Sequence, residues 1–147
     1  MSKIPSATGP IASATGRCLC GAVSFTATEV DPHMHVCHCG MCRRHAGALT
    51  MSVHVGGITF KGESDILRYK SSDIAERGTC KKCGSHLFYH LFQPDMYIMS
   101  IGAFDDQSKF TMGGEIYIDS KPDAYAFAGN HSRETEHEFL KRIGVIS

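Results

Sequence analysis

The stretch HVCHCGMCRRHAG, residues 35–47, places three cysteines and two arginines within thirteen residues. A core strand or a surface loop rarely needs so many thiols so close together. Cys37, Cys39 and Cys42 therefore raise the question of whether they close disulfides, bind a metal or remain free thiols.

The chain has seven cysteines in three short motifs. The motifs are a C-x-C, a C-x-C-x-x-C and a C-x-x-C, at Cys18 and Cys20, at Cys37, Cys39 and Cys42, and at Cys80 and Cys83. Zinc prefers four tetrahedral ligands, and C-x-x-C is a common half-site. Clustered cysteines in a reducing compartment are metal ligands more often than disulfides. The pattern predicts at least one zinc ion.

Two groupings of these cysteines fit the spacing. In the first, the outer two motifs form one closed site of four ligands, and the middle motif forms a second site with an open fourth position. An open position distinguishes catalytic from structural zinc. In the second grouping an ordinary zinc ribbon uses Cys39, Cys42, Cys80 and Cys83, and leaves Cys18, Cys20 and Cys37. Spacing alone leaves both groupings open.

Outside these motifs the hydrophobic pattern is mostly that of β-strands. Apolar and polar residues alternate over 21–30 and 49–55, which is typical of half-buried strands. Further strands are predicted at 57–62, 66–70, 85–92, 96–104 and 115–119. One helix is predicted at 132–144, with Ser132 as its N-cap and Gly144 at its end. The sequence thus indicates an all-β domain with a trailing helix.

Residues 1–15 are rich in Ser, Ala, Thr, Gly and Pro, and we expect a mobile tail there, followed by a single domain over 16–147. The start of the chain lacks the apolar core of a signal peptide, and no apolar run is long enough to cross a membrane, which predicts a cytoplasmic protein. The formal net charge is +0 at pH 7. A balanced charge argues against a nucleic-acid partner.

Four segments together resemble a known family. GRCLCGAVSF at 16–25, CHCGMCRRHAG at 37–47, CKKCGSHLF at 80–88 and IGAFDD at 101–106 resemble the glutathione-dependent formaldehyde-activating enzymes, which share their domain with centromere protein V. The resemblance runs in order from Gly16 to about Phe127. It implies a mainly β fold, a zinc-stapled β-tent of small twisted antiparallel sheets, here with a short C-terminal helix.

The resemblance also implies two zinc ions per chain and assigns their ligands. The structural site of the family corresponds to Cys18, Cys20, Cys80 and Cys83. The functional site corresponds to Cys37, Cys39 and Cys42. This favours the grouping of four plus three.

An open zinc with three thiolate ligands predicts chemistry on a thiol. A thiol in the fourth position loses its proton readily, and its sulfur can add to an aldehyde or leave it. We therefore expect a carbon–sulfur lyase or synthase acting on small thiol–aldehyde adducts such as S-hydroxymethylglutathione. Arg43 and Arg44 are candidates to bind a substrate carboxylate, and His38 is a candidate proton donor.

Other polar residues are weaker candidates. His86 and His90 flank Phe88 two residues away on each side, so they are expected on one strand face, packed or solvated. Phe104 and Asp105 follow a predicted strand and are candidates for the edge of the site.

Two other classes of function compete with the enzyme. The domain could be a non-catalytic zinc-binding interaction module with a protein or nucleic-acid partner. It could instead be a redox or zinc sensor in which oxidation of the middle three cysteines releases the metal.

Overall fold

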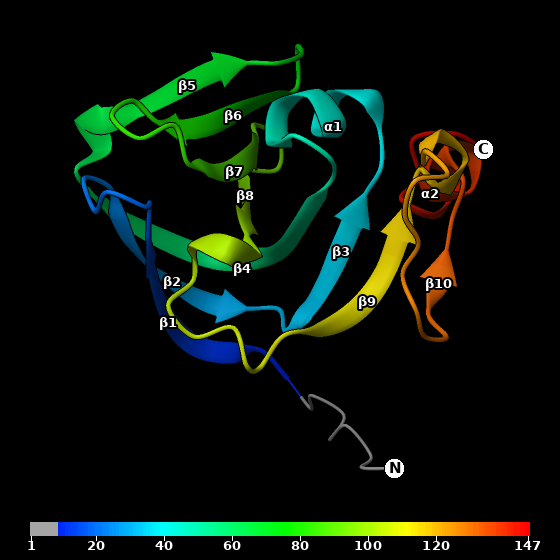
Figure 1. Ribbon diagram of the computed structural model, residues 1–147, viewed down its shortest axis with the longest axis horizontal. Coiled ribbons are helices and arrows are strands. Elements are labelled where there is room, and N and C mark those ends of the chain that lie inside the picture. The colour runs from blue at the N-terminus through cyan, green and yellow to red at the C-terminus, as the bar shows by residue number, and fades with distance from the viewer. Residues whose placement is uncertain (1–8) are drawn as a thin grey trace.

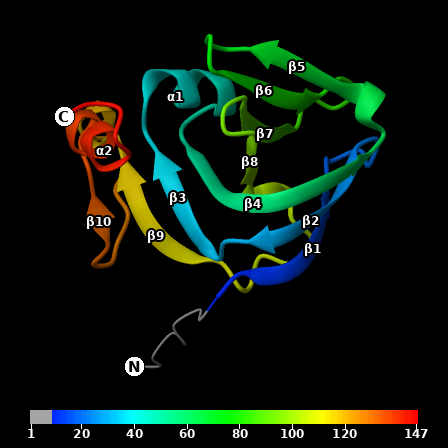
Figure 2. The ribbon, with the colours of Figure 1, turned by 180° about the vertical axis from the view of Figure 1, so that it is seen from behind.

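A computed structural model describes residues 9–147 of the chain. Figures 1 and 2 show a strongly curved sheet, with the short helix α1 at its upper edge and α2 beside the C-terminus. The strands are β1 Ile11–Arg17, β2 Ser24–Val30, β3 His33–Cys37, β4 Thr50–Lys61, β5 Ile66–Lys70, β6 Ala75–Cys80, β7 His86–Leu91, β8 Met96–Ser100, β9 Thr111–Ile116 and β10 Ser132–Arg133. The α-helices are α1 Gly40–Ala46 and α2 Glu136–Arg142, and three short 3-10 helices lie at Glu63–Asp65, Ile101–Ala103 and Ile118–Ser120.

The strands form one continuous mixed sheet of ten strands, in the order β10-β9-β3-β4-β8-β7-β6-β5, with β2 and then β1 branching from β4. Strand β9 runs parallel to β3 and to β10, and the other pairs are antiparallel. The prediction of a mainly β fold with a short C-terminal helix is confirmed.

Strand β4 organises the sheet because its two halves pair with different neighbours. Its first half pairs with β3 and β8, and its second half pairs with β2. The sequence suggested two strands, at 49–55 and 57–62, where the structure has one. Gly56 and Gly57 allow β2 to approach closely, since a Cβ at Gly56 would lie 2.6 Å from the Cβ of Glu29. The glycines therefore mark the close approach of β4 to the side chains of β2 rather than a break between two strands.

The hydrophobic core lies where β2, β4, β7 and β8 meet. Phe25, Phe88 and Met99 are almost completely buried there. Cys18 and Cys80 belong to the same buried cluster, at 1% and 2% exposed. The ends of β1 and β6 are thereby held against the core at these two cysteines.

The expected boundary of the N-terminal tail, after residue 15, is wrong. Strand β1 begins at Ile11 and pairs with β2 in regular register, from Ile11 opposite Val30 to Arg17 opposite Ser24. Small side chains do not prevent this, because strand pairing uses backbone groups that every residue except proline carries. Ile11 and Ala14 also pack against the core. The rest of the expected tail, residues 1–8, lies outside the described residues.

Two helices differ from expectation. Helix α2 begins four residues later than predicted: Thr135 caps it and forms a capping box with Glu138, while Ser132 lies in β10. Gly144, with φ of 83°, follows its end as expected. Helix α1 was not predicted, because it is only seven residues long and shows no apolar stripe.

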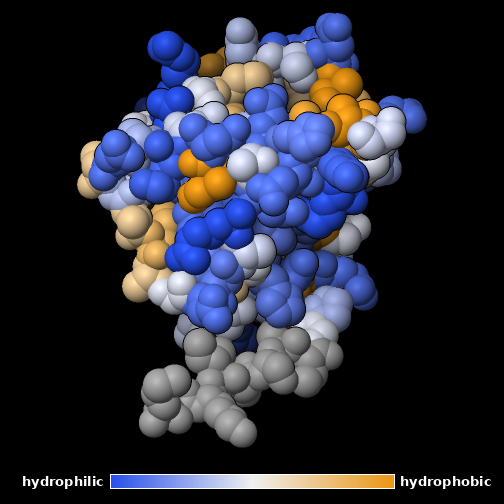
Figure 3. Space-filling model, turned by 90° about the vertical axis from the view of Figure 1, so that its right-hand side faces the viewer, coloured by the Kyte–Doolittle hydropathy of each residue, from blue (hydrophilic) through white to orange (hydrophobic). Residues whose placement is uncertain are grey.

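The surface over the C-terminal segment is mostly hydrophilic, with small, separate hydrophobic patches (Figure 3). No helix within residues 9–147 has the length and apolar character needed to cross a membrane.

Candidate metal centres

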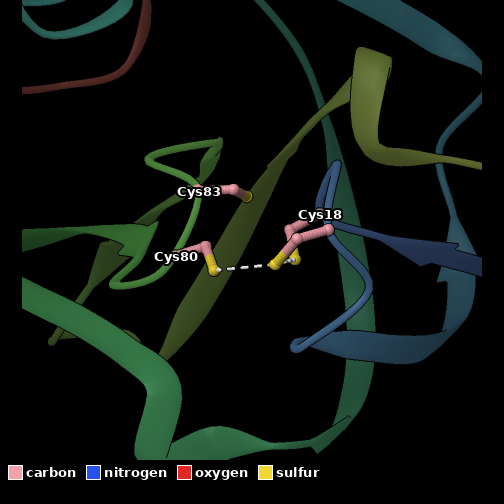
Figure 4. A group of neighbouring side chains, drawn as sticks. Cys18, Cys80 and Cys83 are labelled. Atoms are coloured by element: carbon pink, nitrogen blue, oxygen red, sulfur yellow. Dashed lines mark hydrogen bonds between the residues drawn. The ribbon is translucent and has the colours of Figure 1, made fainter.

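The first cysteine cluster joins the start of the domain to its middle. Cys18 and Cys20 lie in the turn after β1, Cys80 ends β6, and Cys83 follows in the next turn. Their four sulfur atoms all lie within 4.8 Å of one another. Figure 4 shows the side chains of Cys18, Cys80 and Cys83 pointing toward one another from the two turns.

The spacing of these sulfurs fits a tetrahedral metal ion. The Sγ atoms of Cys18 and Cys20 are 3.7 Å apart, and those of Cys20 and Cys80 are 3.8 Å apart. A tetrahedron with metal–sulfur bonds of about 2.3 Å has edges of about 3.8 Å. A disulfide needs a sulfur–sulfur distance of about 2.05 Å, so these cysteines are not paired in that way.

Backbone amides donate hydrogen bonds to two sulfur atoms of this cluster. The amide of Val23 donates to Cys18 Sγ at 3.3 Å, and the amide of Lys82 donates to Cys80 Sγ at 3.4 Å. Hydrogen bonds with Ser85 lower the pKa of Cys83 to about 5. Metal binding requires deprotonated thiols, so the donor set suits a closed metal site.

The second cluster comes from one continuous stretch of chain. Cys37 ends β3, Cys39 is the N-cap of α1, and Cys42 lies in its first turn. Their sulfur atoms lie within 4.8 Å of one another. A strand end and a helix N-terminus fix the spacing, and Cys39 Sγ accepts a hydrogen bond from the amide of Cys42 at 3.3 Å.

A buried arginine completes this second cluster, and the sequence analysis missed it. Arg77 is only 4% exposed, and its Nη1 and Nη2 lie 3.6 and 3.7 Å from Cys42 Sγ. Its guanidinium also lies 5.2 Å from the ring centre of Tyr89. Hydrogen bonding with Cys37 and Cys39 lowers the pKa of Cys42, and the charge of Arg77 acts in the same direction. The only signal in the sequence was a charged residue three positions before Cys80, in a segment where no strand was predicted.

His38 holds the second cluster in place. Its side chain is 0% exposed. Its Nε2 lies 2.7 Å from Glu115 Oε1, and its Nδ1 lies 2.9 Å from the hydroxyl of Tyr125. Its backbone carbonyl accepts a hydrogen bond from Arg43 Nε at 2.9 Å. Both ring nitrogens are therefore occupied by protein groups.

Glu115 connects this segment to the C-terminal part of the chain. It is 1% exposed, and its Oε2 lies 2.6 Å from His131 Nε2 and 3.1 Å from Arg133 Nε. Burial opposes ionisation, but hydrogen bonds with His131 and His38 outweigh it and hold the pKa of Glu115 below its usual range. The carboxylate thus stays charged at neutral pH and ties β9 and β10 to the residue between Cys37 and Cys39.

The two arginines predicted to bind a carboxylate lie in α1. Arg43 is partly buried and bonds through Nε to His38. Arg44 is exposed. The geometry therefore leaves Arg44 facing solvent, whereas Arg43 is partly used in holding the metal-binding segment.

A histidine pair lies beside the second cluster, and the strand pattern missed it. The rings of His45 and His86 meet edge to face, with centres 4.5 Å apart. His45 follows Cys42 by three residues, so both lie on one face of α1. The sequence placed His86 and His90 on one strand face, but a register shift between Gly78 and Thr79 separates them. His90 binds Glu76 instead, with Nδ1 2.7 Å from Oε2.

Comparisons with known proteins agree with this geometry. The family model described as glutathione-dependent formaldehyde-activating enzyme matches residues 13–120. That range contains all seven cysteines. An uncharacterized lyase of Schizosaccharomyces pombe is 32% identical over 130 residues, which cover 87% of this chain and 95% of that protein.

Two further relatives cover less. A putative glutathione-dependent formaldehyde-activating enzyme of Podospora anserina is 35% identical over 81 residues, which span 50% of this chain and 38% of that protein. A crystal structure of a Rhodobacter sphaeroides protein shares the fold with a TM-score of 0.52, at 23% identity, over 62% of this chain and 87% of that one. The match of the family model over most of the domain confirms the resemblance, and this chain belongs to the family of glutathione-dependent formaldehyde-activating enzymes.

Proposed function

We propose that this protein is a zinc-dependent carbon–sulfur lyase or synthase that acts on small thiol–aldehyde adducts of the S-hydroxymethylglutathione type. In this proposal it binds two zinc ions. The first is structural and is bound by Cys18, Cys20, Cys80 and Cys83. The second is functional and is bound by Cys37, Cys39 and Cys42.

The observation that carries this proposal is the difference between the two donor sets. Four sulfurs complete a tetrahedron and leave no position for a substrate. The second cluster offers three sulfurs within 4.8 Å of one another, and a buried arginine lies against Cys42. Three cysteines leave room for a fourth ligand, and the arginine offsets part of their negative charge. Such a site is better suited to binding an anionic sulfur ligand than to a purely structural role.

The zinc ion would supply one element of the chemistry. Held by the three thiolates, it would accept the substrate sulfur as a fourth ligand and stabilise it as a thiolate. The net reaction needs no oxidant: R–SH and an aldehyde combine into R–S–CH(R′)–OH, as a carbon–sulfur bond forms and the thiol proton ends on oxygen. The reverse reaction breaks the same bond and returns that proton to sulfur.

The protein's own residues would orient the second cluster and offset the negative charge of its thiolates. Arg77 stabilises the thiolate of Cys42, because a guanidinium within 3.7 Å offsets part of the negative charge of the cluster. His38, bonded on both sides, orients the metal-binding segment in this proposal instead of moving a proton. Arg43 and Arg44 remain the candidates for a substrate carboxylate.

The test compares the zinc-loaded protein with its Cys39→Ser variant. Magnetisation-exchange NMR measures how fast formaldehyde and glutathione interconvert with their adduct, and elemental analysis counts zinc in the same samples. We expect the wild-type protein to accelerate exchange and the variant, with one zinc, to lose that acceleration. If the wild-type protein with two bound zinc ions does not accelerate adduct exchange for any thiol tested, the enzyme proposal is wrong. The protein is then better explained as a non-catalytic zinc module.

A further inference from the structure

A polar hollow extends from the first cysteine cluster to His86. It has a volume of about 490 Å³ and is lined in part by Cys18, Arg17, Ser100 and His86. Arg17 is exposed, and its Nη1 donates to the carbonyl oxygens of Cys18 and Leu19 at 3.0 Å. The hollow is large enough for a small thiol, and its lining offers hydrogen-bonding groups along with a cation.

Three buried polar atoms around the second cysteine cluster have no hydrogen-bond partner among residues 9–147, and one of them belongs to His86, which lines this hollow. They are Nδ1 of His86, Nδ1 of His45 and Nε of Arg77. Buried polar atoms in folded proteins are nearly always bonded to protein, water or ligand. Three such atoms beside one metal cluster indicate a place that receives a polar group from outside the chain. Since His86 also lines the hollow, that group can arrive through it.

The histidines restrict the chemistry of that group. Burial lowers the pKa of His86 to about 4, and burial followed by the charge of Arg77 lowers the pKa of His45. Both rings are therefore neutral at pH 7, and a neutral imidazole carries one donor and one acceptor nitrogen. A hydroxyl group can both donate and accept, so it suits either Nδ1 whichever tautomer is present.

We propose that this hollow binds a hydroxyalkyl thioether, and that Nδ1 of His86, supported by His45, forms a hydrogen bond with its hydroxyl group. The inference rests on the proposed function, because it names the residues that hold the oxygen end of the adduct. It also explains why His45, one helical turn after Cys42, packs against another histidine, His86 of β7, instead of an aliphatic residue.

The test uses two stable probes of equal shape. S-(2-hydroxyethyl)glutathione carries the hydroxyl, and S-propylglutathione has a methyl group in its place. Calorimetry measures the dissociation constants of both probes for the full-length, zinc-loaded wild type, His86→Phe and His137→Phe. His137 is exposed in α2, so its variant is the matched control. Zinc content is measured for each protein.

We expect the ratio of the two dissociation constants to shift by about tenfold in His86→Phe, toward the propyl probe, and to stay unchanged in His137→Phe. The ¹⁵N signals of His45 and His86 should move when the hydroxyethyl probe binds. An unchanged ratio in His86→Phe, or no binding of either probe by the wild type, overturns the proposal.

The exchange assay with glutathione and formaldehyde separates this inference from the proposed function. If the wild type prefers the hydroxyl probe through His86 but accelerates no exchange, the binding site stands and the enzyme proposal fails. If exchange is accelerated equally in the wild type and His86→Phe, the enzyme proposal stands and the assignment of His86 is wrong.

Discussion

The two cysteine clusters use the same ligand chemistry but lie differently along the chain. In the first, Cys20 and Cys80 are 60 residues apart and meet within 3.8 Å. In the second, all three cysteines fall between the end of β3 and the first turn of α1. A metal in the first cluster would close a long loop, whereas a metal in the second would close a very short one. Cross-linking restricts the unfolded chain more when the loop is longer.

We infer from this difference that the first cluster contributes to folding, whereas the second depends on elements that are already folded. Strand β6 links them, because it carries Cys80 at one cluster and Arg77 at the other. The second cluster is further tied to the C-terminal part of the sheet, because Glu115 of β9 bonds to His38, the residue between Cys37 and Cys39. Four changes test this comparison, ordered by their expected effect on the free energy of unfolding.

The largest effect is expected for Cys80→Ser. The side chain is 2% exposed and belongs both to the first cluster and to the core, so the change removes a metal ligand at a buried position. Because metal binding of this kind contributes directly to folding, the variant should lose its cooperative thermal transition. Circular dichroism during heating measures this. A melting curve close to that of the wild type would refute the structural role of the first cluster.

A smaller loss of unfolding free energy is expected for Glu115→Gln. This variant tests whether the second cluster depends on the surrounding fold. Neutralising a buried carboxylate bonded to His38 and His131 should cost about 1–3 kcal/mol of unfolding free energy. It should also weaken the second zinc site without affecting the first, which a competing chelator can measure. Glu134→Gln is the control, since its ion pair with Arg142 is partly exposed and worth about 0–1 kcal/mol.

The third prediction concerns pH. Because burial lowers the pKa of His86 to about 4, the unfolded chain takes up a proton there below pH 6.5 and the folded protein does not. Stability therefore falls as pH drops from 6.5 toward 4. Between pH 7.5 and 5.5 the wild type should lose about 1 kcal/mol more than His86→Phe. Urea unfolding at both pH values, with zinc content checked, measures the difference. Equal losses would show that His86 is not buried as described.

The smallest change in stability is expected for Cys39→Ser. Serine is a favourable N-cap residue, so it preserves the cap of α1 that Cys39 now provides. The loss of unfolding free energy should stay below about 1 kcal/mol, while zinc content falls from two ions to one. If this variant unfolds as completely as Cys80→Ser, the comparison between the clusters is wrong, and both sites are structural.

Much of this architecture follows from local patterns. The hydrophobic pattern predicts β2, β4, β5, β7 and β8. The cysteine spacing, once the family resemblance is recognised, identifies both donor sets. These features can be read along the chain because strand periodicity and ligand spacing are local properties. Strands β1, β3, β6 and β10 were not predicted. In β1 most side chains are small, so the strand is recognised only by its backbone pairing with β2.

The chain by itself determined the seven thiols, their three motifs and the strand-rich character of the domain. Only the tertiary structure decided which thiols meet, that Arg77 contacts Cys42, and that His86 turns toward His45. Contacts between distant segments depend on strand order and register, and one register shift moves a side chain to the opposite face of a sheet. Spacing along the chain therefore identifies the candidate ligands, while their grouping and the residues that surround each group depend on how the sheet folds.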